Sequence, residues 1–160
     1  MTRVSRTAIH EAGHAMAVQL RGGTVTGITL RPGQVTYRLP RERKRFFVNG
    51  VRTDEPVTDR LPESYGFVAY AGCWASVRSR KPLSANGFTN LVLAELASNP
   101  TDFESFNDCA PLAHWLDSWN QELENAWPDI KVLAQRLVNA HAAQSDSKSF
   151  SGQRVDIVNE

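Results

Sequence analysis

A pair of histidines four residues apart, with a glutamate after the first, constrains this chain more than any other feature. The segment reads His10-Glu11-Ala12-Gly13-His14. Residues four apart lie on one face of a helix, so both imidazoles can share a metal ion while Glu11 projects beside them. Zinc peptidases use such imidazoles to hold the ion and such a carboxylate to take a proton from water. The segment therefore predicts a zinc site on a helix.

The residues around the motif favour this interpretation over a helix that carries two histidines by chance. Small side chains allow another element to approach closely: Ala12, Gly13, Ala15 and Ala17. Larger apolar side chains give the helix a surface to bury: Ile9, Met16, Val18 and Leu20. We expect the helix to begin between Thr2 and Thr7 and to end near Arg21, where Gly22-Gly23 follows.

The composition is that of an ordinary globular protein with one domain. The chain has 160 residues, of which 41% are hydrophobic and 22% charged, and its net charge is +1. Such a charge gives no general attraction to nucleic acid or lipid. No apolar run reaches the roughly 18 to 20 residues that span a bilayer, and the first residues are polar and basic. We therefore expect a cytoplasmic protein with no membrane segment.

The chain contains two cysteines, Cys73 and Cys109. They are too few and too far apart for a disulfide scaffold or for a zinc ribbon, which needs Cys-x-x-Cys pairs. Each is interpreted as a small buried apolar residue.

We expect a mainly α (α+β) fold with a small antiparallel hairpin or sheet after the first helix. Three strands are predicted, at 24–30, 34–39 and 45–48. Gly27 is a candidate bulge, Arg31-Pro32-Gly33 is a turn signal, and 51–59 is expected to be a loop.

Helical spacing of apolar residues indicates four further segments, at 62–81, 88–98, 101–109 and 110–143. Thr101 and Glu104 form a candidate capping box at the start of the third of these. Pro128 is expected to kink or restart the last. We expect a single domain over 1–143 and a polar, flexible tail over 144–160, in which 155–158 could dock on the domain.

A basic run lies between the second and third predicted strands: Arg38, Arg41, Arg43, Lys44 and Arg45. Such an arm can attract phosphates or acidic peptides. The alternative is a solvated arm of a hairpin, and this is favoured because no nucleic-acid-binding module accompanies the run.

A catalytic zinc ion needs a third protein ligand and an open position. The third histidine of the metzincin pattern would fall six residues after His14, where the chain has Leu20. The other histidines are His114 and His141. A carboxylate is the better candidate, and five lie on predicted helices: Glu63, Glu95, Asp102, Glu104 and Asp108.

The run Ala8-Ile-His-Glu-Ala-Gly-His-Ala15 resembles the zinc helix of the FtsH family of zinc peptidases. The following strand, Thr26-Gly-Ile-Thr-Leu-Arg-Pro32, and Ala69-Tyr-Ala-Gly-Cys-Trp-Ala75 are also similar to segments of that family. The resemblance implies that an aspartate followed by an apolar residue on a later helix is the third ligand. Asp102-Phe103 matches that pattern best, ahead of Asp108 and then of Glu104 or Glu95.

The chain also departs from the FtsH pattern. Ser76 stands where the family has an acidic residue, and the sequence has no Gly-x-x-x-x-Gly-Lys-[Ser/Thr] nucleotide loop. The resemblance therefore implies a peptidase domain that stands alone, without the ATPase half or the membrane anchor of the family.

These observations lead to a zinc metalloendopeptidase as the first hypothesis. His10, His14 and Asp102 would bind Zn²⁺, and Glu11 would be the general base. The expected substrate is a peptide or unfolded protein, met directly or through a separate ATPase or partner protein. The alternative is a zinc-stabilised module of weak or no activity that binds a protein or nucleic acid through the arm 38–45. Glu11 argues against the alternative, because a structural zinc site has no use for a carboxylate that is not a ligand.

Overall fold

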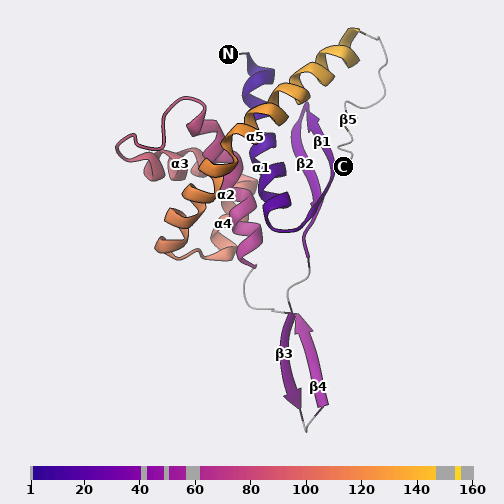
Figure 1. Cartoon of the computed structure of the whole chain (residues 1–160), viewed down its shortest axis with the longest axis vertical. Coiled ribbons are helices and arrows are strands. Elements are labelled where there is room, and N and C mark those ends of the chain that lie inside the picture. Colours follow the sequence, from indigo (N-terminus) through magenta and orange to yellow (C-terminus); the bar gives the residue numbers. More distant parts are fainter. Residues whose placement is uncertain (1, 41–42, 49–50, 57–61, 147–153, 156–160) are drawn as a thin grey trace.

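The computed structural model describes residues 2–40, 43–48, 51–56, 62–146 and 154–155. The fold is mainly helical with an antiparallel sheet after the first helix, which confirms the predicted class (Figure 1). The helices are α1 (Arg3–Leu20), α2 (Glu63–Arg78), α3 (Phe88–Ala97), α4 (Pro100–Cys109) and α5 (Ala113–Asp146). The strands are β1 (Thr24–Leu30), β2 (Gly33–Arg38), β3 (Arg43–Val48), β4 (Val51–Pro56) and β5 (Arg154–Val155).

The helix α1 begins and ends where the sequence predicts. The side chain of Thr2 accepts a hydrogen bond from the backbone N–H of Ser5, which caps the first turn. Gly22 follows the last turn with a φ of 73°, a conformation that ends helices at little cost when the residue is glycine. α1 packs against α2, α5, β1 and β2, so the metal motif lies at the centre of the molecule (Figure 1).

β1 is the middle strand of a three-stranded antiparallel sheet with the order β2-β1-β5. The register between β1 and β2 shifts between Val25 and Gly27, which confirms the predicted bulge. Val155 pairs with Ile28, so part of the expected tail docks on the sheet.

The third predicted strand does not join this sheet, because β3 pairs with β4 in a separate two-stranded ladder that extends away from the helices (Figure 1). The loop predicted at 51–59 is also wrong over 51–56, which is β4, while 57–59 lie outside the described residues. The register pairs Val48 with Val51, which leaves Asn49-Gly50 between the strands. Asn-Gly is a strong signal for a two-residue hairpin turn, so the local pairing of β3 with β4 prevails over pairing with β2.

Two details of the later helices differ from the prediction. α4 begins at Pro100 with Asn99 as its N-cap, so Thr101 lies inside the helix and forms no capping box. Proline suits the first helical position because its missing N–H would have no partner there. Pro128 does not restart α5, which runs without interruption past the predicted end at 143 to Asp146. Burial of Trp127 and Ile130 on either side of the proline favours the continuous helix.

α2 is the core helix, and its largest side chains face other helices. Phe67, Tyr70 and Trp74 are fully buried and belong to the core. The ring of Tyr70 lies 5.5 Å from that of Trp119, and its hydroxyl donates to Asn120 Oδ1 over 2.8 Å. The buried hydroxyl and amide thus satisfy each other, and α2 is fixed against α5.

An ion-pair network ties α1, α2 and α5 together at the end of α1. The guanidinium of Arg21 donates to both carboxylate oxygens of Glu63, at 2.9 and 2.8 Å, and also pairs with Glu122 at 2.6 Å. Glu63 Oε1 further accepts from the indole N–H of Trp119 over 2.6 Å. Glu63, one of the five candidate ligands, therefore has a structural role far along α2 from the histidines.

Candidate metal centre

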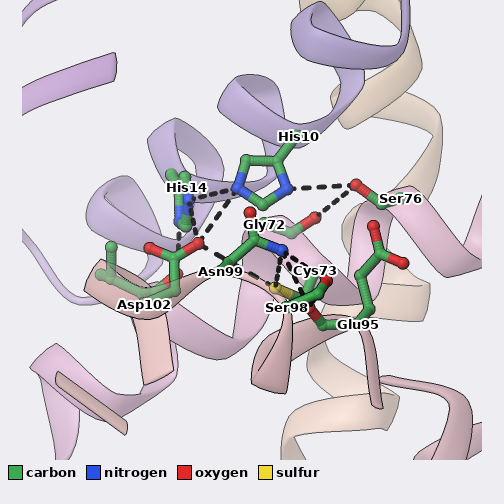
Figure 2. Close-up of polar contacts among 10 residues, drawn as sticks. His10, His14, Gly72, Cys73, Ser76, Glu95, Ser98, Asn99 and Asp102 are labelled. Carbon is green, nitrogen blue, oxygen red and sulfur yellow. Dashed lines mark hydrogen bonds and ion pairs between the residues drawn. The ribbon is translucent and has the colours of Figure 1, made fainter. Parts of the chain in front are cut away.

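Three potential ligand atoms from α1 and α4 converge on one point. His10 Nε2 and His14 Nε2 are 3.0 Å apart, and Asp102 Oδ2 lies 3.1 Å from the first and 3.3 Å from the second. Figure 2 shows the three side chains pointing toward one another. The structure therefore brings together the residues that motif and resemblance selected, although Asp102 is 92 residues from His10 in the sequence.

The outer nitrogens of both histidines are held by groups that dictate which ring nitrogen carries the proton. His14 Nδ1 lies 2.7 Å from the carbonyl oxygen of Val68, which only accepts hydrogen bonds. Ser76 donates its hydroxyl to Gly72 O over 3.2 Å, so it accepts from His10 Nδ1 over 3.1 Å. Both Nδ1 atoms are donors, and in the neutral rings both Nε2 atoms are left as acceptors that face Asp102. Metal-ligating histidines are oriented in this way.

Two glycines allow the helices to meet at the centre. A Cβ on Gly72 of α2 would overlap the imidazole of His14 and lie 2.9 Å from His10 Nε2. A Cβ on Gly13 of α1 would lie 2.5 Å from the carbonyl oxygen of Ala71. Glycine is therefore required on both helices for α2 to pass directly beneath the histidine pair.

The Asp102 carboxylate interacts electrostatically with both imidazoles, those of His10 and His14. Burial alone would raise the pKa of Asp102, but hydrogen bonds from His10 and His14 hold it well below its usual range. Burial alone would lower the pKa of His14, but Asp102 and Glu11 raise it to about 9. The carboxylate thus stays ionised and attracts a positive charge to the point where the Nε2 atoms meet.

Glu11 lies beside the centre without joining the three converging atoms. It is 5% exposed, and burial raises the pKa of its carboxyl. A Cβ on Gly33 would lie 2.6 Å from Glu11 Oε1, so the first residue of β2 covers the carboxylate closely. A carboxyl with a raised pKa exchanges protons more readily near neutral pH, as a general base requires.

An open pocket of about 670 Å³ adjoins the centre. His10, Glu11 and His14 form part of its wall together with Asp102. β2 forms another part through Gly33, Gln34, Val35 and Tyr37. The centre is therefore accessible to a ligand that lies along β2.

The donor set fits a zinc ion. Zinc binds imidazole nitrogen and carboxylate oxygen at about 2.0 to 2.2 Å, and at these bond lengths tetrahedrally arranged ligand atoms are about 3.3 Å apart. The observed separations of 3.0 to 3.3 Å match that spacing. Two neutral imidazoles and one carboxylate are also a ligand set typical of catalytic zinc.

The other candidate carboxylates of the later helices lie elsewhere. Glu104 and Asp108 are exposed on α4 and do not line the pocket. Glu95 lines the pocket but forms an ion pair of 3.2 Å with Arg80. Asp102 is therefore the carboxylate that the described structure places against the histidines.

Sequence reasoning missed Ser76 as a site residue, although the Ala-Gly-x-x-Ala pattern marked its helix. Cys73 was interpreted as a small buried apolar residue, and its side chain is indeed buried, as that of Cys109 is. The remaining histidines stay outside the pocket, His114 exposed and His141 buried on α5.

The basic run is split between two elements, with Arg38 ending β2 and Arg43 opening β3. The register of the ladder sets Lys44 opposite Glu55 and Arg45 opposite Asp54. The register of the ladder agrees with the interpretation of the run as an arm of a hairpin.

Comparisons with protein-family models, curated proteins and solved structures found no match to this chain. Among the described helices, none combines the length and the apolar character needed to cross a membrane. The function must therefore be argued from the geometry of the centre.

Proposed function

We propose that the protein is a zinc metallopeptidase of the FtsH-like type that the first helix resembles. The observation that carries the proposal is the convergence of His10 Nε2, His14 Nε2 and Asp102 Oδ2 within 3.0 to 3.3 Å of one another. Glu11 is buried beside them and lines the same pocket. A structural zinc site needs neither an accessible pocket nor a carboxylate that is not a ligand.

The residues divide the chemistry among them. When bound, zinc supplies Lewis acidity toward the scissile carbonyl and the attacking water. Glu11 accepts one proton from that water as its oxygen bonds to the carbonyl carbon, and then delivers the proton to the amine nitrogen as the C–N bond breaks. Ser76 and Val68 hold the imidazoles of His10 and His14 in the tautomer that ligation needs.

The substrate that fits this pocket is an extended peptide. β2 is one of the two outer strands of the described three-stranded sheet, and its residues line the pocket beside Glu11. An extended chain can add to such an edge through backbone hydrogen bonds, which would carry its amide bonds past the centre. Flexible peptides or unfolded proteins suit this arrangement, presented directly or by a partner protein such as a separate ATPase. We also propose a cytoplasmic location, where cysteines such as the buried Cys73 stay reduced.

Hydrolysis of casein by zinc-loaded protein tests the proposal. Glu11→Gln should keep one zinc ion per chain and abolish hydrolysis, because the amide cannot accept the proton. Glu104→Gln is the matched control, since the same change at an exposed position of α4 should leave the rate unchanged. Equal rates for wild type and Glu11→Gln would refute the assigned mechanism. A wild type that binds zinc but cleaves nothing would favour the binding module.

A further inference from the structure

Arg6 is a basic side chain in the wall of the pocket, and the mechanism proposed above gives it no part. It precedes His10 by four residues on α1, so both side chains lie on the same face of the helix, and both line the pocket. In the described part of the chain, Arg6 alone among the lysines and arginines lines it. Its place near the N-terminus of α1 does not benefit the helix, because the helix dipole disfavours a positive charge there. A role for this charge is therefore to be sought in the pocket.

The charge of Arg6 is left without an acidic partner. Arg6 is exposed and forms no ion pair with any residue that the structure describes. The other charged side chains of the wall have partners: Glu95 pairs with Arg80 over 3.2 Å, and Asp102 faces the two histidines. When Zn²⁺ is bound by neutral imidazoles, its charge balances the carboxylates of Asp102 and Glu11. Among the described residues of the wall, the charge that then remains is the positive charge of Arg6.

β2 packs along α1 and runs in the same direction. At the first residue of β2, a Cβ on Gly33 would lie 2.7 Å from Thr7 Cγ2, next to Arg6 in the sequence. At the last residue of β2, the carbonyl oxygen of Arg38 would lie 2.6 Å from a Cβ on Gly23, beyond the end of α1. A peptide that adds to β2 therefore passes the metal centre at one point and Arg6 about one helical turn away.

We propose that Arg6 binds a carboxylate of the peptide substrate while the substrate lies along β2. The inference rests on the proposed function, since it takes the ligand to be the substrate of the same centre. A guanidinium suits this role because it can donate two parallel N–H···O hydrogen bonds to one carboxylate. One helical turn spans about 5.4 Å and one extended residue about 3.3 Å, so the carboxylate is expected about one to three residues from the bond that is cut. An acidic side chain and the C-terminus of a peptide both offer this group.

Binding of short peptides tests the inference without relying on cleavage. Zinc-loaded Glu11→Gln is titrated calorimetrically with acetylated hexapeptides that contain one phenylalanine and otherwise alanine. One peptide has a free C-terminal carboxylate, and the others are amidated and carry either glutamate or, as neutral counterparts, glutamine at each alanine position in turn. A carboxylate peptide should bind about 10-fold more tightly than its neutral counterpart, the usual effect of a hydrogen bond between charged groups. The peptide that shows this preference identifies the source of the carboxylate.

Arg6→Gln, added to Glu11→Gln, should remove the preference. Arg3→Gln is the matched control and should keep it, because Arg3 is exposed on the same helix and does not line the pocket. A preference that survives in Arg6→Gln, as it would if zinc itself bound the carboxylate, overturns the inference, and so does equal or absent binding of all the peptides. Casein hydrolysis by wild type is measured separately. A preference that depends on Arg6 in a wild type that cleaves nothing would overturn the peptidase and leave the carboxylate site in place.

Discussion

Ser76 accepts a hydrogen bond from His10 Nδ1 over 3.1 Å. This bond fixes the ring of His10 with Nε2 toward Asp102. Ser76→Ala should therefore weaken zinc binding by about 10- to 100-fold, the usual effect of losing such a partner. Competition with a chromophoric chelator measures the affinity. Ser118→Ala, at an exposed serine of α5, should bind zinc as wild type does, and an unchanged affinity in Ser76→Ala would contradict this role.

Gly72 allows α2 to pass beneath both histidines, and Gly72→Ala should abolish stoichiometric zinc binding. The added methyl group would overlap the imidazole of His14 and approach His10 Nε2 to 2.9 Å. Gly13→Ala is the contrasting variant, because its methyl group would meet the backbone of Ala71 and not the imidazoles. It should lower the free energy of unfolding by about 1 to 3 kcal/mol, as overpacking does. Metal analysis and denaturant unfolding separate the two effects, and full zinc occupancy in Gly72→Ala would refute the predicted overlap.

Zinc binding should release about one proton per ion at pH 7. The raised pKa of His14, about 9, means that its imidazole is protonated at pH 7 in the metal-free protein, whereas ligation needs the neutral ring. Apparent affinity should accordingly rise with pH and level off above about pH 9. Calorimetric titration in two buffers with different ionisation enthalpies measures the protons released. Release of none at pH 7 would show that His14 is neutral in the metal-free protein.

Arg21 joins Glu63 and Glu122 in a partly buried network, and Arg21→Met should destabilise the protein by about 2 to 4 kcal/mol. The loss arises because Glu63 would keep its charge without its cationic partner. The pair of Arg80 with Glu95 offers the control, because the side chain of Arg80 is 55% exposed. Arg80→Met should lower the free energy of unfolding, measured with a denaturant, by less than about 1 kcal/mol. Similar losses for both variants would contradict the importance of burial here.

Local patterns predicted α1 and the β1–β2 pair because their signals lie within short stretches of sequence. Thr2 caps α1, Gly22 ends it, and Gly27 marks the bulge. β4 was missed because its residues are mostly polar, and only its pairing with β3 makes it a strand. Pro128 does not restart the helix because burial of its neighbours outweighs the hydrogen bond that proline removes.

The candidate site was predictable only in part. His10, Glu11 and His14 form a local motif, whereas Asp102 is 92 residues from His10 and was selected through resemblance to FtsH. The contribution of Ser76 could not be read from spacing, since it depends on where α2 places the hydroxyl beside His10 Nδ1. Such contacts depend on the packing angle of two helices, which no local pattern encodes.

The most direct test is a crystal structure of the zinc-loaded protein with anomalous diffraction at the zinc edge. We expect one zinc ion bonded to His10 Nε2, His14 Nε2 and Asp102 Oδ2 at about 2.0 to 2.2 Å, with Glu11 unbound beside it. A protein that takes up no zinc, or an ion that leaves Asp102 uncoordinated, would contradict the proposed metal centre.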